Sequence, residues 1–579
     1  MYIENINSPA DVKKLNIMQL NVLAEEMRHA LLTRASRHGG HFGPNFGMVE
    51  AIIAMHYVFD SPKDKIVFDV SHQCYPHKML TGRKDAYLYE EHYDDVSGYT
   101  NPDESEHDFF TVGHTSTSIS LACGLAKARD LNGEDGNVIA VIGDGSLSGG
   151  EALEGLDFAS ELNGNMIIVA NDNDMSIAEN HGGLYANLKL LRETNGQAEC
   201  NLFKAMNLDY IYVDKGNDIA SLIEAFEKVK DTKKAVVVHI NTLKGKGYAP
   251  AEQNKEEWHW HMPFDIATGE SLFKGGEPDF SDASLEYLLK KMDEDKSVVA
   301  ITAGTPTVMG FTADMRAKAG KQFVDVGIAE ETAVALASGI AANGGKPVFG
   351  VYSSFIQRAY DQITQDVCIT FTVFAGSVYG MNDVTHLGLQ DIPMLNSIPG
   401  LVYLAPVTKE DYIAMLDWSL TQNAYPVAIK IPGGSMISTG VPVTKDFSKL
   451  DTYEITKKGS RVAILGLGTF YENAVKAADI LKSSHGIDAT VINPYYISGI
   501  DADTLNELKK DHAVVATLED GYLEGGFGAK IAAFYGSSDM KVLNFGIKKE
   551  FIDRYDVSEV LKDNHLTPEQ IAEDIAATL

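Results

Sequence analysis

Two short apolar runs decide the fold class of this chain: VIAVIGDG at residues 138–145 and MIIVANDN at residues 166–173. Both are rich in aliphatic and β-branched residues, which is typical of strands buried in a parallel sheet. The segment between them predicts a helix that opens at residues 146–150 and ends at Gly164, because apolar residues recur at Leu153, Leu156, Ala159 and Leu162. A right-handed crossover of this kind brings the turns after both strands to one carboxyl edge of the sheet.

The side chains on these two turns suit a metal-bound diphosphate. Asp144 stands between two glycines, and Asn173 closes the second turn. A carboxylate and an amide oxygen are ligands for a small hard cation, and glycines let the backbone approach a ligand closely. A GDG turn alone is most often only a turn, but the second strand and its asparagine at this spacing favour a cofactor site.

The arrangement resembles the motif of thiamine diphosphate enzymes. The resemblance implies Mg²⁺ bound by the Asp144 carboxylate, the Asn173 side chain and the backbone carbonyl of Met175. Diphosphate oxygens and a water would complete the six oxygen ligands that Mg²⁺ prefers. Gly145 and Ser146 would lie beside the diphosphate.

Length and composition bound the remaining possibilities. A chain of 579 residues is too long for one core, and its net charge of −32 argues against a nucleic-acid surface. No apolar run approaches the length of a membrane span, and the first residues do not resemble a signal peptide. Cysteines without CxxC spacing predict reduced thiols and a cytoplasmic location; they are Cys74, Cys123, Cys200 and Cys368.

Alternating strand and helix patterns predict an α/β fold with three doubly wound domains and mostly parallel sheets. We expect domains at residues 1–264, 285–442 and 443–579. A linker is expected at residues 265–284, which are rich in Gly, Asp and Ser.

Glu330 is the second candidate catalytic position. Residues 323–330, FVDVGIAE, predict a strand that runs through a glycine turn into a helix opened by Glu330. A carboxylate there also favours the helix dipole, so capping is an alternative role. In thiamine diphosphate enzymes a glutamate of a second domain hydrogen-bonds the aminopyrimidine ring and promotes deprotonation of the thiazolium carbon, which implies that role for Glu330.

Further segments resemble the 1-deoxy-D-xylulose-5-phosphate synthase family of transketolase-like enzymes, in the family's order and over nearly the whole chain. They are RHGGHFG (37–43), DVSHQCYPHKMLTGR (69–83), GHTSTSIS (113–120), KGKGYAPAE (244–252) and YSSFIQRAYDQ (352–362). The resemblance implies the transketolase-like architecture, thiamine diphosphate with Mg²⁺, and a homodimer.

The resemblance also implies roles for individual residues. The diphosphate site would include His72, Gly113, His114, Thr115 and Tyr248. Phe355 would stack on the aminopyrimidine, with Arg358 one helical turn onward.

His41, His259 and His386 match histidines that line the family's substrate funnel. An imidazole there can polarise a carbonyl and transfer its proton. A single histidine is more often a structural residue, which is the role we expect for His77 and His261.

The implied reaction condenses pyruvate with D-glyceraldehyde 3-phosphate, releasing CO₂ and forming 1-deoxy-D-xylulose 5-phosphate, a precursor of isoprenoids, thiamine and pyridoxal.

The segments expected to bind the acceptor aldehyde depart from the family's pattern. Residues 431–434 read IPGG where the family has YPRG, residues 374–386 contain no arginine, and residues 87–99 are acidic. An arginine–phosphate contact is strong and glycine cannot replace it.

Three interpretations of these departures stay open. Lys430, Arg358 or another cation serves the acceptor phosphate, or the chain is a divergent transketolase-like carboligase with another donor or a non-phosphorylated aldehyde. The third is a non-catalytic paralogue that binds the cofactor.

Overall fold

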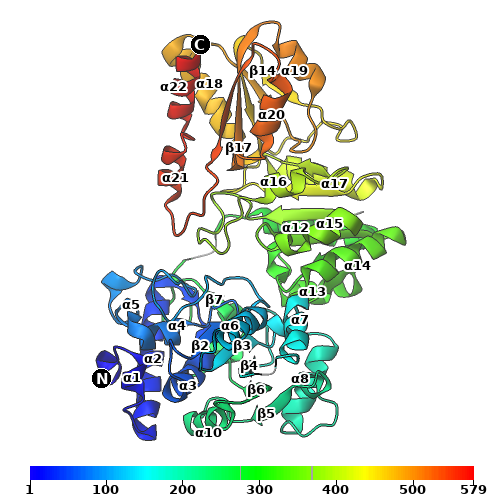
Figure 1. The fold of residues 1–579 in the computed structure, drawn as a ribbon. Coiled ribbons are helices and arrows are strands. Elements are labelled where there is room, and N and C mark those ends of the chain that lie inside the picture. Colours follow the sequence, from blue (N-terminus) through cyan, green and yellow to red (C-terminus); the bar gives the residue numbers. More distant parts are fainter. Residues whose placement is uncertain (163, 274–275, 367–368) are drawn as a thin grey trace. The chain divides into compact units, whose positions relative to one another are not determined.

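The structure is a computed structural model that describes residues 1–162, 164–273, 276–366 and 369–579. The chain folds into two compact units, which Figure 1 colours along the sequence. Unit 1 comprises Met1–Gly276 with Gly327–Ala329, and unit 2 comprises Glu277–Val326 with Glu330–Leu579.

Unit 1 is built on a parallel sheet with the order β2-β3-β4-β6-β5. Its strands are β2 (Lys65–Phe68), β3 (Val138–Gly143), β4 (Met166–Asp172), β5 (Asp209–Val213) and β6 (Ala235–Asn241). Gly143 lies opposite Asn171 in the β3–β4 register. The predicted strands are therefore confirmed, and their turns leave the same edge of the sheet.

Helices cover both faces of this sheet. Along β3, Ile139 and Val141 face one apolar core, whereas Ala140 and Ile142 face the other. The first core takes side chains from α2 (Ile17–His38), α3 (Gly43–Val58) and α10 (Ile219–Val229), and the second from α6 (Ser118–Asn132), α7 (Gly150–Ala159), α8 (Gly183–Glu193) and α9 (Leu202–Ala205). The shorter helices are α1 (Pro9–Val12), α4 (Tyr75–Lys78), α5 (Asp85–Leu88) and α11 (Ala249–Gln253).

The helix predicted between the two motif strands is shorter than expected. Residues Ser146–Ser148 form a 3-10 turn, and α7 spans only Gly150–Ala159. At its end the amide of Ser160 bonds the carbonyl of Asp157, and the amide of Leu162 bonds that of Ala159. These three-residue turns tighten the chain before Gly164, so Leu162 is buried outside the helix.

Unit 2 contains two sheets. The first is parallel with the order β12-β13-β11-β10-β8-β9, from β8 (Val298–Thr302), β9 (Phe323–Asp325), β10 (Lys346–Tyr352), β11 (Thr370–Phe374), β12 (Val402–Leu404) and β13 (Val427–Lys430). The other has the order β14-β16-β15-β17-β18, from β14 (Glu454–Lys457), β15 (Arg461–Gly466), β16 (Thr490–Asn493), β17 (His512–Tyr522) and β18 (Lys541–Ile547). In this second sheet β14 runs antiparallel to its neighbour, and the other pairs are parallel. Three mostly parallel sheets confirm the predicted α/β fold.

The two sheets of unit 2 share one apolar core. It contains Phe349 and Val373 from the first sheet and Leu465 and Val515 from the second. The shared core explains why residues on both sides of position 442 form one compact unit; the domain boundary there stays a prediction. The helices are α12 (Phe280–Glu294), α13 (Ala313–Ala319), α14 (Glu330–Ala342), α15 (Tyr360–Asp366), α16 (Asp391–Asn396), α17 (Lys409–Thr421), α18 (Tyr471–His485), α19 (Ala502–Leu508), α20 (Phe527–Tyr535), α21 (Val557–Asp563) and α22 (Pro568–Thr578).

The linker predicted at residues 265–284 ends too late, because α12 begins at Phe280. Asp279 accepts hydrogen bonds from the amides of Ser281 and Asp282, and Asp282 accepts one from the amide of Asp279. The acidic residues that resembled linker composition thus form a reciprocal N-terminal cap.

Two bulk expectations can be compared with the structure. Among the described residues, no helix has both the length and the apolarity needed to cross a membrane. Cys74 and Cys123 are buried, Cys200 is exposed, and all three are free thiols. Cys368 lies outside the described residues.

Candidate functional site

The Asp144 carboxylate joins the two motif turns in unit 1. The side chain is buried, and its Oδ1 accepts a hydrogen bond from the amide of Gly145 at 3.0 Å. Its Oδ2 accepts bonds from the amide of Met175 at 3.1 Å and from Nδ2 of Asn180 at 3.0 Å. The structure therefore brings Asp144 to the turn that carries Asn173, as predicted.

Two amide oxygens at this turn fit a cation. Oδ1 of Asn173 and Oδ1 of Asn180 are buried and accept no hydrogen bond from any described residue. A buried acceptor left unpaired is costly, and a bound cation would satisfy it. Sequence reasoning assigned no role to Asn180, whose position eight residues after the Asp172 strand end gives no periodic signal.

The turn after β3 is tightly packed at Gly145, where a larger residue would overlap a neighbouring side chain. A Cβ on Gly145 would lie 2.6 Å from Oγ of Ser176, closer than a side chain tolerates. In the part of the chain that the structure describes, no three His, Cys, Asp or Glu side chains form a metal-binding group. A cation here would therefore use one carboxylate, neutral oxygens and the ligand's own oxygens, which suits Mg²⁺ on a diphosphate.

The electrostatics of Asp144 also favour a cation. Burial, reinforced by the charge of Asp172, raises the pKa of Asp144 to about 7. A bound cation stabilises the ionised carboxylate and reverses that shift.

Lys244 is a residue of this region that sequence reasoning missed. It is buried, and its Nζ donates to the carbonyl of Ser176 at 2.6 Å and lies 3.1 Å from Nδ1 of His259. Burial lowers the pKa of Lys244 to about 7, against the charge of Asp144. Its place at the start of the KGKGY segment is the signal that could have identified it.

Three of the predicted histidines converge in unit 1. The strand β1 (Gly40–His41) pairs with β7 (Trp260–His261), which brings His41 to the segment that carries His259. Ring centroids lie 5.1 Å apart for His41 and His72, 5.2 Å for His72 and His259, and 5.9 Å for His41 and His259. Burial, and then the charge of Lys244, lowers the pKa of His259 well below its ordinary value, so this imidazole is neutral at neutral pH.

Asn45, a second residue that the sequence did not reveal, fixes two of these histidines. Its Nδ2 donates to the backbone carbonyls of His41 and His72, both at 2.8 Å. Its Oδ1 accepts from the amide of Tyr75 at 2.9 Å. Asn45 is fully buried on α3, so it sets the spacing between the two histidine segments.

The turn with Gly113, His114 and Thr115 is held in place by Asp69. Asp69 accepts hydrogen bonds from the amide of Ser116 at 2.8 Å and from the amide of Ser118 at 3.0 Å. The Ser116 hydroxyl donates to the carbonyl of Ser146 at 2.8 Å. This predicted turn therefore lies next to Ser146, at the GDG turn.

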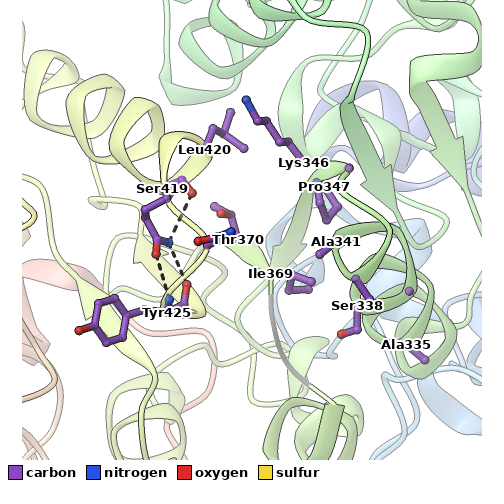
Figure 2. A pocket seen from close by; sticks show the side chains of 15 residues that line it. Ala335, Ser338, Ala341, Lys346, Pro347, Ile369, Thr370, Ser419, Leu420 and Tyr425 are labelled. Carbon is purple, nitrogen blue, oxygen red and sulfur yellow. Dashed lines mark hydrogen bonds between the residues drawn. The ribbon is translucent and has the colours of Figure 1, made fainter.

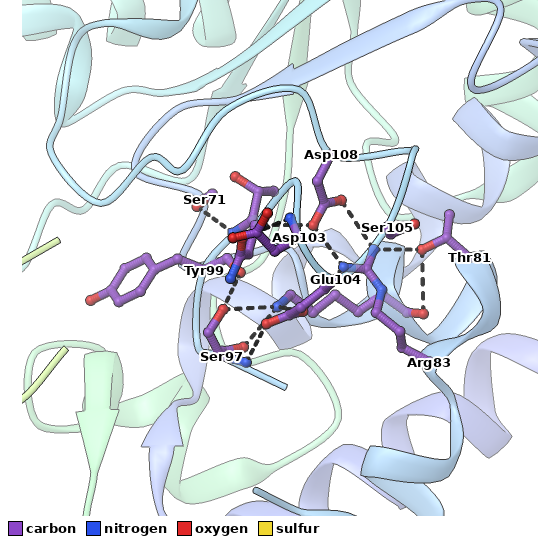
Figure 3. Close-up of polar contacts among 12 residues, drawn as sticks. Ser71, Thr81, Arg83, Ser97, Tyr99, Asp103, Glu104, Ser105 and Asp108 are labelled. Atoms are coloured by element: carbon purple, nitrogen blue, oxygen red, sulfur yellow. Dashed lines mark hydrogen bonds and ion pairs between the residues drawn. The ribbon is translucent and has the colours of Figure 1, made fainter. Parts of the chain in front are cut away.

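The other end of the 69–83 segment is anchored by ion pairs. Arg83 donates to both carboxylate oxygens of Asp108, at 2.6 and 3.0 Å, and its Nη1 lies 3.3 Å from Glu104 (Figure 3). His77 bonds Asp108 at 2.9 Å and His56 at 2.9 Å inside this buried network. His77 is thus in the structural setting that was expected for it.

Tyr248 lies in an aromatic cluster. Its ring centroid is 5.0 Å from that of Trp258 and 5.5 Å from that of Phe42, and its hydroxyl donates to the carbonyl of Ile266 at 2.9 Å. The neighbouring His261 stacks on Trp258 at 4.1 Å, which agrees with a structural role. The predicted contact of Tyr248 with the diphosphate stays a prediction.

In unit 2, Glu330 opens α14 as predicted and is 3 % exposed. Its Oε2 accepts no hydrogen bond from the residues described and lies 3.5 Å from Nη1 of Arg358. Burial raises the pKa of Glu330 to about 7, and the positive charge of Arg358 opposes the shift. The geometry gives a carboxyl group that can hold or release a proton near neutral pH.

Phe355 and His386 lie together in the same unit. Their rings meet edge to face with centroids 5.5 Å apart, and the amide of Arg358 reaches the carbonyl of Phe355 at 3.4 Å in the 3-10 turn Ile356–Ala359. Phe355 thus contacts both His386 and the segment that carries Arg358.

Asp383, which sequence reasoning did not select, orients His386. Oδ1 of Asp383 lies 3.2 Å from Nδ1 of His386 and accepts the amides of Thr385 and His386, each at 3.1 Å. Burial alone would raise the pKa of Asp383, but the hydrogen bond with His386 and the charge of that imidazole lower it below its ordinary value. Because an ionised carboxylate only accepts, it favours the proton on Nδ1 and leaves Nε2 as an acceptor.

Comparisons with known proteins identify the family. Residues 3–201 match 1-deoxy-D-xylulose-5-phosphate synthase, residues 276–436 the transketolase pyrimidine binding domain, and residues 451–571 the transketolase C-terminal domain. A 1-deoxy-D-xylulose-5-phosphate synthase of Geobacter sulfurreducens is 38% identical over 618 residues, covering 98% of both chains. That of Caldanaerobacter subterraneus is 36% identical, covering 99% of this chain and 98% of its own. The chain belongs to the 1-deoxy-D-xylulose-5-phosphate synthase family.

Family membership bears on the cofactor. The pyrimidine binding domain, at residues 276–436, implies thiamine diphosphate. Glu330, Phe355, Arg358 and His386 all fall inside this match.

The segment at residues 431–434 has no room for a side chain at Gly433. A Cβ there would lie 1.9 Å from Oγ and 2.5 Å from Cβ of Ser377. Lys430 is buried against Asp391, with Nζ to Oδ2 at 2.7 Å, and also bonds the carbonyl of Gly376. The ammonium group of Lys430 is therefore buried and paired within unit 2. This geometry does not support the expectation that Lys430 binds an acceptor phosphate.

Proposed function

We propose that this chain condenses pyruvate with D-glyceraldehyde 3-phosphate to 1-deoxy-D-xylulose 5-phosphate and CO₂, with thiamine diphosphate and Mg²⁺. The observation that carries the proposal is the 36–38% identity to proteins named as synthases of this product, over 98–99% of the chain. The buried acidic and amide groups at the motif turns support it independently.

In this proposal unit 1 holds the diphosphate end of the cofactor. Asp144, Asn173 and the carbonyl of Met175 would bind Mg²⁺, and the diphosphate would contact His72, Gly113, His114, Thr115, Gly145, Ser146 and Tyr248. The amide oxygens of Asn173 and Asn180, which accept no hydrogen bond from the described residues, support the metal assignment. When bound, thiamine diphosphate supplies a nucleophilic carbon and an electron sink for decarboxylation.

Unit 2 residues would handle the aminopyrimidine end. Glu330 would accept and return a proton at Oε2, where burial keeps its pKa near neutrality. Phe355 would stack on the ring, and Arg358 would tune the charge of Glu330 across 3.5 Å. Neutral His259 with His41, and His386 oriented by Asp383, would bind substrate carbonyl and hydroxyl groups.

A second candidate function is the same carboligation with a different donor or a non-phosphorylated aldehyde. The observation that favours it is the absence of side-chain room at Gly433, together with the burial of Lys430 against Asp391. A phosphate needs a cation or several amide donors, and this segment offers neither as a side chain.

We also propose a homodimer and a cytoplasmic location. The helix α14 exposes small and apolar side chains, among them Ala335, Leu336 and Gly339, and Leu336 is 37% exposed. Ala335 lines a pocket of unit 2 with Ser338, Thr370 and Ser419 (Figure 2). Sedimentation of the purified protein would test the dimer.

The test of the reaction is CO₂ release from pyruvate with and without D-glyceraldehyde 3-phosphate. We expect the acceptor to stimulate CO₂ release and the product to have the mass of 1-deoxy-D-xylulose 5-phosphate. Release stimulated only by a non-phosphorylated aldehyde would favour the second candidate. No release with any donor would contradict both.

A further inference from the structure

Arg192 of α8 binds the two carboxylates that flank Asn173. Its Nη1 lies 2.6 and 2.7 Å from the two carboxylate oxygens of Asp172, and its Nη2 lies 2.6 Å from Oδ1 of Asp174. The guanidinium is a planar fork of donors, so one rigid group holds both neighbours of Asn173 at once.

Two residues of the sheet, on β6 and β5, also support this turn. Nε2 of His239, a fully buried residue on β6, lies 2.9 Å from Oδ2 of Asp172. The hydroxyl of Tyr210 on β5 bonds Nδ1 of His239 at 2.8 Å. Asp172 is thereby held by Arg192 of α8 and by His239 of β6, and Tyr210 of β5 in turn holds His239.

The backbone of the turn is held as well. Nζ of Lys255 donates to the carbonyl of Asn173 at 3.0 Å, and the amide of Met175 donates to Asp144. Asp174 adopts a positive φ of 60°, a conformation that needs support from its surroundings in a residue other than glycine.

One polar group of this framework has no partner within the described part of the chain: Oδ1 of Asn173, which is buried. Arg192 bonds the carboxylates of Asp172 and Asp174, and Lys255 bonds the backbone carbonyl of Asn173, so neither reaches this oxygen. A framework this complete around one acceptor oxygen indicates that the oxygen is held for a ligand.

We propose that Arg192 is a positioning residue, which fixes Oδ1 of Asn173 for Mg²⁺ by clamping Asp172 and Asp174. Arg192 also pairs its positive charge with the carboxylates of Asp172 and Asp174. The inference rests on the proposed binding of thiamine diphosphate and Mg²⁺, and it adds a residue of α8 to the groups that determine metal affinity.

Two variants test the clamp, Arg192→Met and Asp174→Asn, and Lys189→Met is their control. Asp174 is 61% exposed on its side chain, so Asp174→Asn removes the ionic part of its contact with Arg192 without burying a charge. Lys189 lies one turn before Arg192 on α8 and forms an exposed pair with Glu193 at 3.8 Å, away from the clamp, so Lys189→Met is the matched control.

The measurement is calorimetric titration of Mg²⁺ into each full-length protein at saturating thiamine diphosphate, alongside kcat at saturating Mg²⁺. Loss of a group that orients a metal ligand typically weakens metal affinity about 10–100-fold. We expect this for Arg192→Met, a smaller loss for Asp174→Asn and none for Lys189→Met, with kcat largely restored by excess Mg²⁺.

The outcomes separate the two proposals. Wild-type affinity in both folded clamp variants overturns the role of Arg192 and leaves the proposed function intact. Loss of kcat that excess Mg²⁺ does not restore identifies a merely structural role and also overturns it. If the wild-type protein binds neither cofactor nor Mg²⁺, the proposed function fails, and the clamp with it. If Arg192→Met does not fold, Asp174→Asn alone decides.

Discussion

Met175 donates its backbone amide to Oδ2 of Asp144 at 3.1 Å, across 31 positions of sequence. This bond joins the turn after β3 to the turn after β4, which carries Asn173. Both turns leave the carboxyl edge of a parallel sheet, where α/β folds bind ligands.

Asp144→Ala removes the only carboxylate proposed to bind the metal. We expect this variant to fold, but to lose the rise in melting temperature that thiamine diphosphate with Mg²⁺ gives the wild-type protein. A ligand at 100 times its Kd stabilises a protein by about 2.7 kcal/mol, which is readily measured. Asp157→Ala, on the exposed face of α7, is the control, and an unchanged ligand effect in Asp144→Ala would contradict the assignment.

Glu330→Ala tests the proposed acid–base role. General acid–base groups typically contribute about 10²–10⁴-fold to a rate, so kcat for CO₂ release should fall by that factor. The circular dichroism spectrum should stay unchanged. Glu331→Gln, one residue along the helix at a half-buried position, should retain activity, and full activity in Glu330→Ala would refute the role.

Glu330 also predicts a pH dependence of stability. Its pKa of about 7 in the folded state lies above the ordinary value of 4.5, so the folded protein binds more protons between these pH values. Its contribution is therefore most favourable below pH 4.5 and declines as the pH rises to 7. Glu330→Gln should become more stable than the wild-type protein over this range, by on the order of 3 kcal/mol at most. Urea unfolding at several pH values measures the difference, and a difference that does not grow with pH would contradict the burial argument.

Most strands and the position of the motif follow from the sequence, because buried parallel strands are continuous apolar runs and their turns carry the chemistry. The runs at 138–142 and 166–170 are examples. Local patterns of this kind depend on few residues, so they can be recognised without tertiary contacts.

Other features depend on contacts that no local pattern reveals. Asn45 bonds His41 and His72 from different segments, and Asp69 reaches the 113–118 turn. The contact of Lys244 with His259 is likewise tertiary, although the KGKGY segment carries a sequence signal for this lysine. The start of α12 was missed for a different reason: the cap formed by Asp279 has the composition of a linker.

Asp383→Asn tests the orientation of His386. An amide offers a donor as well as an acceptor to Nδ1, so the preferred tautomer of the imidazole is no longer set. We expect kcat to fall about tenfold or more and the pH profile to shift, because tautomer control contributes through the proton-transfer step. Nitrogen NMR of His386 would show the change of tautomer, and an unchanged tautomer and pH profile would exclude the positioning role.

Gly433→Ala tests the reason why no side chain stands at this position. The new Cβ would overlap Oγ and Cβ of Ser377, and overpacking of this kind costs about 1–3 kcal/mol. The double variant Gly433→Ala/Ser377→Gly removes the overlapping atoms and should recover much of that loss. Denaturant unfolding measures the free energy of unfolding of both variants. Wild-type stability in Gly433→Ala would contradict the predicted overlap with Ser377.

The central claim, that this synthase family member binds thiamine diphosphate through Mg²⁺ at the Asp144 turn, is tested most directly by calorimetry. Titration of thiamine diphosphate into the full-length protein with Mg²⁺ should give a saturable heat, which disappears when Mg²⁺ is withheld or Asp144 is replaced by alanine. The absence of a saturable heat in the wild-type protein, or the same heat without Mg²⁺, would contradict the account.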